Sequence, residues 1–187
     1  MARSSDKLPV LIIEGYKDYR PPKWVKGAIE KLLWTVPPKY LVGLESVVLT
    51  NSGGQSRRER RRRFSSRGRR IPSSRVLAFY SPASRRKRPH IEIYVDKGSK
   101  DPWWVNALPP LRETLIGTTL FHELGHHIHY TQRPEHRNEE VVAEEWCDKF
   151  TANFLRKRYW YLLPILVPAA WVIRFFKYGS GTEKTPR

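Results

Sequence analysis

The most informative stretch of the chain is Leu111–Tyr130, LRETLIGTTLFHELGHHIHY. Pro109 and Pro110 precede it, and proline is favoured in the first turn of a helix. One set of side chains recurs at helical spacing and falls near one face: Leu111, Leu115, Thr118, Thr119, His122, His126 and His129. The pattern predicts one long helix that presents its histidines on a single face.

Two of these histidines have the spacing of metal ligands. His122 and His126 are four residues apart, which on a helix places them about 40° apart around the axis and about 6 Å apart along it. In hydrolytic zinc sites, His-Glu-x-x-His supplies two imidazoles for the ion and a carboxylate that takes a proton from a metal-acidified water. We therefore expect Zn²⁺ on His122 and His126 with Glu123 as general base, rather than two merely packed histidines. Gly125 predicts close approach of a neighbouring backbone.

A catalytic zinc site usually has a third protein ligand. The acidic helix predicted at 138–157 supplies candidates, and Glu144 and Asp148 share one face at i,i+4 spacing. We expect Glu144 to bind the metal and Asp148 to orient a ligand histidine, with Glu145 as the main competitor. Glu139 and Glu140 are expected to be solvated charges that favour the helix N-terminus.

The remaining histidines fit the metal less well. His129 shares the face but lies about 10.5 Å along the axis from His122, too far for one ion. His127 points off the metal face and is expected to be exposed. Gln132 occupies the position where a long histidine-rich zinc motif has its third histidine.

The other elements follow from periodicity and from turn residues. The sequence predicts strands at 8–13, 44–50, 76–80 and 90–96, and a helix that begins after Pro21-Pro22 and ends before Pro37-Pro38. The last strand, HIEIYVD, alternates apolar and polar residues as a half-buried or edge strand does. We expect an extended substrate to pair with it near Ile91, Ile93 and Val95.

Charge is the second feature of the sequence. The chain has 35 Lys plus Arg against 18 Asp plus Glu, a formal charge of +17. Much of the excess lies in one patch whose arginines include Arg57, Arg58, Arg60, Arg61, Arg62 and Arg63. Such a run contacts phosphates without reading sequence, or is a solvated loop or a localisation-type patch. We expect residues 52–74 to be a disordered insertion that binds nucleic acid or another acidic partner.

The two terminal segments and the cysteine count indicate the cellular compartment. A single cysteine, Cys147, excludes an internal disulfide framework, so a reducing, cytoplasmic compartment is expected. The N-terminus does not have the pattern of a signal peptide. Residues 158–187 form an apolar and basic extension after a catalytic domain predicted at 1–157, and 159–176 suit either packing on the domain or peripheral contact with a membrane.

The motif His122–His126 followed by Glu144-x-x-x-Asp148-x-Phe150 resembles the gluzincin metallopeptidases, and among them the small ImmA/IrrE type. The resemblance covers about residues 90–157. It implies an α+β, zincin-like fold: a small mixed sheet with an edge strand next to the active-site helix, then a helix whose glutamate completes the zinc site. Cys147 stands where the family commonly has alanine, and the arginine-rich insertion has no counterpart in the family pattern.

The function expected from these residues is hydrolysis of peptide bonds in a protein or peptide substrate, with zinc polarising the carbonyl and Glu123 moving the proton. The alternative is a basic nucleic-acid-binding protein in which the zinc site is structural or vestigial.

Overall fold

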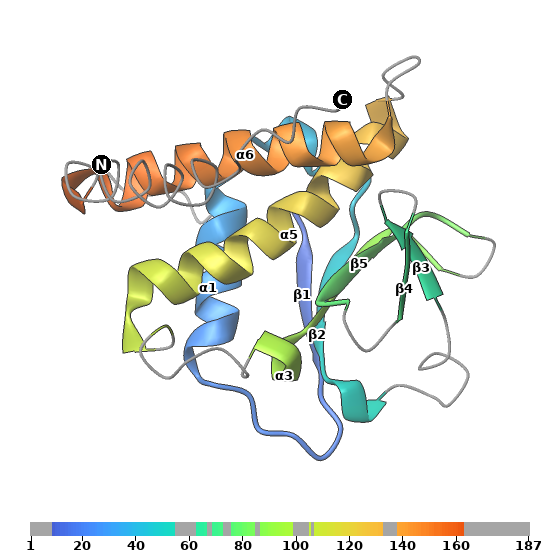
Figure 1. Cartoon of the computed structure of the whole chain (residues 1–187), viewed down its shortest axis with the longest axis horizontal. Coiled ribbons are helices and arrows are strands. Elements are labelled where there is room, and N and C mark those ends of the chain that lie inside the picture. The colour runs from blue at the N-terminus through green and yellow to red at the C-terminus, as the bar shows by residue number, and fades with distance from the viewer. Residues whose placement is uncertain are drawn as a thin grey trace, which may run out of the picture.

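A four-stranded mixed sheet forms the base of the computed structural model, in the order β1-β2-β6-β5 (Figure 1). The structure describes residues 9–54, 63–66, 69–72, 76–84, 87–98, 105, 107–132 and 138–162. The strands are β1 (Leu11–Gly15), β2 (Ser46–Thr50), β5 (Ala78–Ser81) and β6 (His90–Tyr94). β2 pairs in parallel with both β1 and β6, and β5 pairs with β6 in the antiparallel sense.

One face of the sheet carries the core. The register aligns Ile12, Val47, Ile91 and Tyr80 in one row across all four strands. Val47 and Ile91 in this row are completely buried. The side chains of Leu11 and Ile13 point to the other face of β1 and are exposed.

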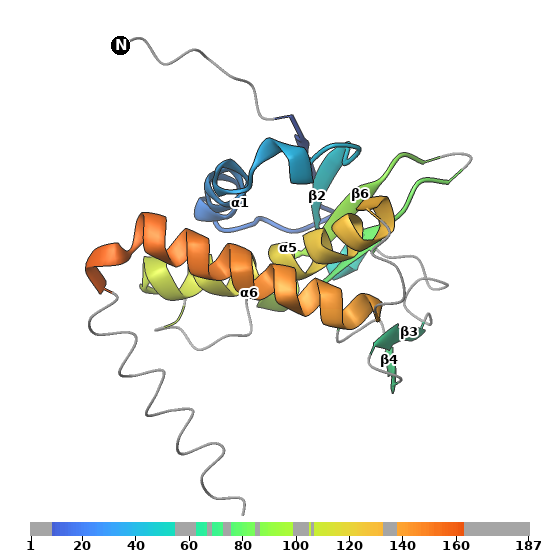
Figure 2. The same ribbon diagram turned by 90° about the horizontal axis from the view of Figure 1, so that it is seen from above.

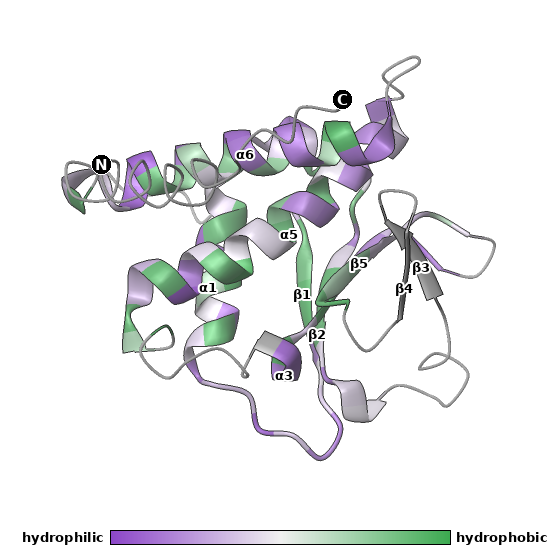
Figure 3. Ribbon diagram, viewed as in Figure 1, coloured by the Kyte–Doolittle hydropathy of each residue, from purple (hydrophilic) through white to green (hydrophobic). Residues whose placement is uncertain are grey.

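Three long helices complete the fold: α1 (Trp24–Thr35), α5 (Pro109–Gln132) and α6 (Glu139–Arg158). α5 and α6 lie side by side, and α1 contacts both (Figures 1 and 2). Figure 3 shows apolar residues concentrated in α1 and the central strands, whereas α6 is largely hydrophilic along its length. Short helices α3 (Val95–Gly98), η1 (Pro38–Tyr40), η2 (Ser52–Gly54) and η4 (Trp160–Leu162) join or end these elements.

The predicted helices are confirmed to within two residues at each end for α5 and α6. The predicted helix between Pro21-Pro22 and Pro37-Pro38 is α1, whose buried side chains are Val25, Ala28, Ile29, Leu32 and Leu33. The mixed α+β class is confirmed as well.

The expectation that β6 is an edge strand is wrong. β6 pairs with β2 on one side and β5 on the other, so the backbone around Ile91 and Ile93 is already paired in the sheet. Val95 belongs to α3 instead of the strand. The alternation reflects a central strand whose polar positions are also largely covered: His90 is buried and Glu92 is half-buried. The edge strand that contacts α5 is β5.

The arginine-rich segment was predicted to be disordered at 52–74. Within it the structure describes η2 and an antiparallel hairpin, β3 (Arg63–Ser66) and β4 (Arg69–Pro72), whose register pairs Phe64 with Ile71. The hairpin stands apart from the four-stranded sheet (Figures 1 and 2). Arg57, Arg58, Arg60, Arg61 and Arg62 lie outside the described residues, as do residues 163–187. Among the helices that the structure describes, none is both long and apolar enough to cross a bilayer.

Candidate metal centre

His122 and His126 lie one turn apart on α5 and direct their rings toward one point. Their Nε2 atoms are 3.2 Å apart, and the two rings are nearly perpendicular. Two nitrogens bound to one tetrahedral zinc at the usual bond lengths stand about 3.3 Å apart. The geometry of this pair therefore matches the spacing that a zinc ion requires.

α6 brings carboxylates to the same point. It begins after Asn138, whose side chain accepts a hydrogen bond of 2.9 Å from the backbone N–H of Glu140 and so caps the helix. Capping fixes the first turn, in which Glu140 Oε2 lies 3.7 Å from His122 Nε2. His122, His126 and Glu140 form a group whose possible ligand atoms all lie within 4.8 Å of one another.

Glu139 contacts the other side of His126. Its Oε1 lies 2.9 Å from His126 Nδ1, although the contact lacks the angles of a hydrogen bond. The two groups are therefore in close contact without a hydrogen bond between them. Glu140 Oε2 is buried and makes no hydrogen bond to any described residue. A buried carboxylate oxygen without a hydrogen bond is costly unless a cation or a proton occupies the site.

Gly125 is what allows α6 to come this close. A Cβ at this position would lie 2.5 Å from the Cα of Ala143 and 2.7 Å from its carbonyl oxygen. The predicted close backbone approach at Gly125 is thus confirmed, and it sets the separation of the two helices at the level of the histidines.

Glu123 faces the sheet instead of α6. Its Oε2 accepts a hydrogen bond of 2.6 Å from the backbone N–H of Tyr80 in β5. Burial raises the pKa of Glu123 to about 7, the Tyr80 hydrogen bond opposes this shift, and the charges of Glu140 and Glu139 add to it. A carboxyl group with such a pKa can both accept and donate a proton near neutral pH.

His127, one turn after Glu123 on α5, contacts the side chain of Tyr80. His127 is completely buried, so the expectation that it is exposed is wrong: this side of α5 packs against β5 and the turn at residues 41–43 rather than solvent. His127 Nε2 lies 3.1 Å from the carbonyl of Val42, and Nδ1 lies 3.2 Å from the hydroxyl of Tyr80. Because a carbonyl only accepts, Nε2 carries the proton and Nδ1 accepts from Tyr80. Burial lowers the pKa of His127, consistent with this neutral form.

The two acidic residues predicted at the site lie further along α6. Glu144 lies on the same face of α6 as Glu140, one turn later. Ala143 and Cys147 pack this face on α5. The Sγ of Cys147 donates to the carbonyl of Thr118. Glu144 is half-buried but is not in the group that lies together. Asp148 is exposed, as is Glu139, whereas the Glu140 side chain is only 20% exposed.

Sequence reasoning missed Tyr80, and it treated Glu140 as a solvated charge. A signal for Glu140 exists in the chain: an Asn cap at 138 fixes the first turn of α6 directly after the short connection from α5. No local signal marks Tyr80, because its role depends on which strand lies at the sheet edge.

Comparison with known proteins gives no match: no family model, curated protein or solved structure is significantly similar to this chain.

Proposed function

We propose that this protein is a zinc-dependent peptidase whose centre is built from His122, His126 and a carboxylate of α6. The observation that carries the proposal is the spacing of the two Nε2 atoms, 3.2 Å, on a helix whose next carboxylate, Glu123, faces the free edge of a sheet. A hydrogen bond between the two rings has the same length, so the carboxylate of Glu140, whose possible ligand atom lies within 4.8 Å of theirs, is what favours a metal at this point.

The donor set suits zinc. Two imidazole nitrogens and one carboxylate oxygen leave a fourth tetrahedral position open, as catalytic zinc sites require. Among the acidic side chains, the geometry favours Glu140 as the third ligand, with Glu139 orienting His126 through Nδ1. When bound, the ion polarises the substrate carbonyl and lowers the pKa of a water molecule.

Glu123 serves as the proton carrier. Its carboxylate accepts a proton from the attacking water and returns it to the leaving amine. The Tyr80 N–H fixes the position of Oε2, which leaves the other carboxylate oxygen of Glu123 for the water.

β5 offers the substrate an edge. Tyr94 donates its N–H to the carbonyl of Leu77, so Leu77 and Phe79 direct their backbone groups toward β6. Ala78 and Tyr80 therefore direct theirs outward, beside α5. An extended peptide that pairs there would pass next to Glu123.

The order of the elements supports a zincin-like fold. The edge strand β5 lies beside α5, which carries His122 and His126, and α6 follows with the proposed third ligand. The resemblance of the motifs to gluzincins of the ImmA/IrrE type supports the same reaction. On this basis the substrate is a protein or peptide, and the arginine-rich segment is a separate contact for acidic partners.

The test measures zinc content and peptidase activity in the full chain. Wild type and Glu123→Gln should each bind one zinc per chain, and only wild type should cleave a fluorogenic peptide library. Glu45→Gln, at a half-exposed carboxylate that pairs with Arg88, is the matched control and should keep full activity. Cleavage by Glu123→Gln would refute the role of the base. Absence of zinc, together with a salt-dependent nucleic-acid affinity that is lost on deleting residues 55–70, would favour the nucleic-acid alternative.

A further inference from the structure

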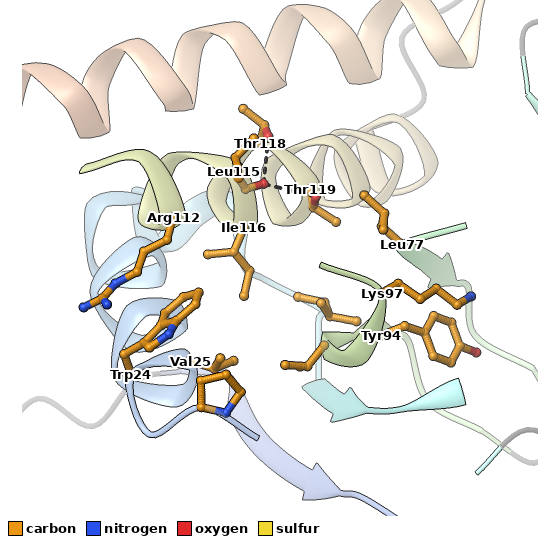
Figure 4. A pocket seen from close by; sticks show the side chains of 13 residues that line it. Trp24, Val25, Leu77, Tyr94, Lys97, Arg112, Leu115, Ile116, Thr118 and Thr119 are labelled. Carbon is orange, nitrogen blue, oxygen red and sulfur yellow. Dashed lines mark hydrogen bonds between the residues drawn. The ribbon is translucent and has the colours of Figure 1, made fainter. Parts of the chain in front are cut away.

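A cavity of about 400 Å³ opens beside the candidate site, between α1, α5, α3 and the start of β5 (Figure 4). This volume falls within the range of about 300–1,000 Å³ found for ligand pockets. Its walls are mainly apolar, with side chains that include Trp24, Val25, Leu77, Ile93, Leu115 and Ile116. Figure 4 shows Ile116 pointing into the middle of the space.

The cavity and the candidate site lie one after the other along α5. Leu115, Ile116 and Thr119 line it, and they lie on the same helical stripe as His122 and Glu123. Thr119 precedes His122 by three residues, or about 4.5 Å along the helix axis. A side chain bound in the cavity would thus be attached to a backbone close to Glu123.

The edge strand leads to the same place. Tyr80 N–H bonds Glu123, whereas Leu77, three residues earlier, lines the cavity. β5 therefore runs beside α5 in the same direction as the helix. A peptide that pairs with Ala78 and with the carbonyl of Tyr80, whose N–H is held by Glu123, advances about 7 Å per two residues, so it reaches the cavity within one or two residues of Glu123.

Several polar groups around the cavity already have partners within the protein. The hydroxyls of Thr118 and Thr119 both donate to the carbonyl of Leu115 within the helix. Lys97 Nζ donates to the carbonyl of Val76 and lies 4.1 Å from the centre of the Tyr94 ring. The Arg112 guanidinium lies 4.9 Å from the ring of Trp24. Figure 4 shows both cations directed away from the middle of the cavity, which leaves an apolar interior with a positively charged rim.

We propose that this cavity is the specificity pocket of the enzyme and takes a large apolar side chain, such as leucine or phenylalanine, within two residues of the cleaved bond. The inference rests on the proposed peptidase function. Burial of the substrate side chain against Ile93 and Ile116 provides the affinity. Lysine and arginine are rejected, because none of the described residues that line the cavity carries a carboxylate to pair with them, and Lys97 and Arg112 repel them at the rim.

The first experiment tests binding without activity. N-acetyl-leucinamide, N-acetyl-phenylalaninamide and N-acetyl-lysinamide are titrated into the full chain while isoleucine methyl resonances are followed by NMR. The two apolar amides should shift the methyls of Ile93 and Ile116, and the lysine amide should not. Ile116→Phe, which fills the space, should weaken apolar binding about tenfold or more. Ile13→Phe, the same substitution at an exposed position of β1, should leave it unchanged.

The second experiment measures kcat/KM on peptides that differ at one position. Leucine should exceed alanine by at least about tenfold, lysine should be cleaved least, and Ile116→Phe should abolish the leucine preference. Ile116→Ala, which enlarges the pocket, should shift the preference toward phenylalanine and covers the case in which Ile116→Phe does not fold. Equal binding of the lysine amide, or an unchanged leucine preference in both variants, overturns the pocket. Absence of all cleavage by zinc-loaded wild type refutes the peptidase function instead, and with it the assignment of the cavity to a substrate.

Discussion

The backbone N–H of Tyr80 donates a 2.6 Å hydrogen bond to Oε2 of Glu123 and so joins the edge strand β5 to the helix α5. The hydroxyl of the same tyrosine donates to His127 at 3.2 Å, one turn further along the helix. Tyr80 is therefore held at two points of α5, one turn apart. These two contacts fix the position of the outward-facing backbone groups of β5 relative to Glu123, the candidate base.

Substitution of Glu123 should separate its charge from its role as an acceptor. Glu123→Ala leaves the Tyr80 N–H without its partner and should lower the free energy of unfolding by about 1–3 kcal/mol. Glu123→Gln keeps a carbonyl oxygen for this hydrogen bond and removes a charge that burial disfavours, so it should be at least as stable as wild type at pH 8. Urea unfolding of the metal-free proteins measures both values. A glutamine variant as unstable as the alanine variant would contradict the structural role of the bond.

A methyl group at Gly125 should force α5 and α6 apart. The added Cβ would meet backbone atoms of Ala143 at 2.5 Å, and backbone cannot rotate away as a side chain can. Gly125→Ala should therefore lose about 1–3 kcal/mol of stability and raise the Kd for zinc, because Glu140 moves away from His122. The matched control is Gly27→Ala in α1, where a Cβ meets nothing within 4 Å. It should gain about 0.5–1 kcal/mol from helix propensity, and equal losses in the two variants would contradict the packing argument.

Two glutamates of α6 compete for the metal, and zinc affinity separates them. Glu140 Oε2 lies 3.7 Å from His122 Nε2, and Glu140 joins both histidines in one group. Glu140→Gln should therefore raise the zinc Kd by at least about 100-fold in a competition assay with a chelator. Glu139→Gln, which alters the contact to His126 Nδ1, should raise it by about 10–100-fold. Retention of zinc by Glu140→Gln with its loss in Glu144→Gln would restore the assignment made from the sequence.

The features that the sequence predicted well are local ones. The bounds of α5 and α6 follow from helical periodicity, from Pro109-Pro110 and from the Asn138 cap, all of which act within a few residues. The convergence of the His122 and His126 rings follows from one turn of helix geometry in the same way. The close helix contact at Gly125 was predicted because only glycine lacks a side chain to prevent it.

The features that could not be predicted depend on pairing between distant segments. β5 and β6 both have strand patterns, and only the sheet order decides that β5 lies at the edge and that Ile91, Ile93 and Val95 are not available to a substrate. Likewise, the choice between Glu140 and Glu144 depends on how far α6 is shifted along α5, which the packing at Gly125 and Ala143 sets. A spacing of four residues along one helix carries no information about that shift.

High pH should weaken the fold through Tyr159. Its hydroxyl donates a 2.6 Å hydrogen bond to Glu113, whose other oxygen pairs with Lys31 at 3.3 Å and so ties the ends of α6, α5 and α1 together. Burial raises the pKa of Tyr159, and the hydrogen bond and charge of Glu113 raise it further. The stabilisation is therefore complete below the unfolded pKa of about 10 and is lost as the pH rises above it, by about 1.4 kcal/mol per pH unit.

Tyr159→Phe isolates this contribution. At pH 8 the variant should be less stable than wild type by about 1–2 kcal/mol, because a buried hydrogen bond is lost. The difference should shrink above pH 10, where only the wild-type unfolded chain gains from ionising Tyr159. Tyr161→Phe, at a side chain that is 56% exposed, serves as the control and should follow wild type at every pH. Urea unfolding from pH 8 to pH 11 gives the three curves, and a constant gap between wild type and Tyr159→Phe would show that the hydroxyl does not titrate as this contact requires.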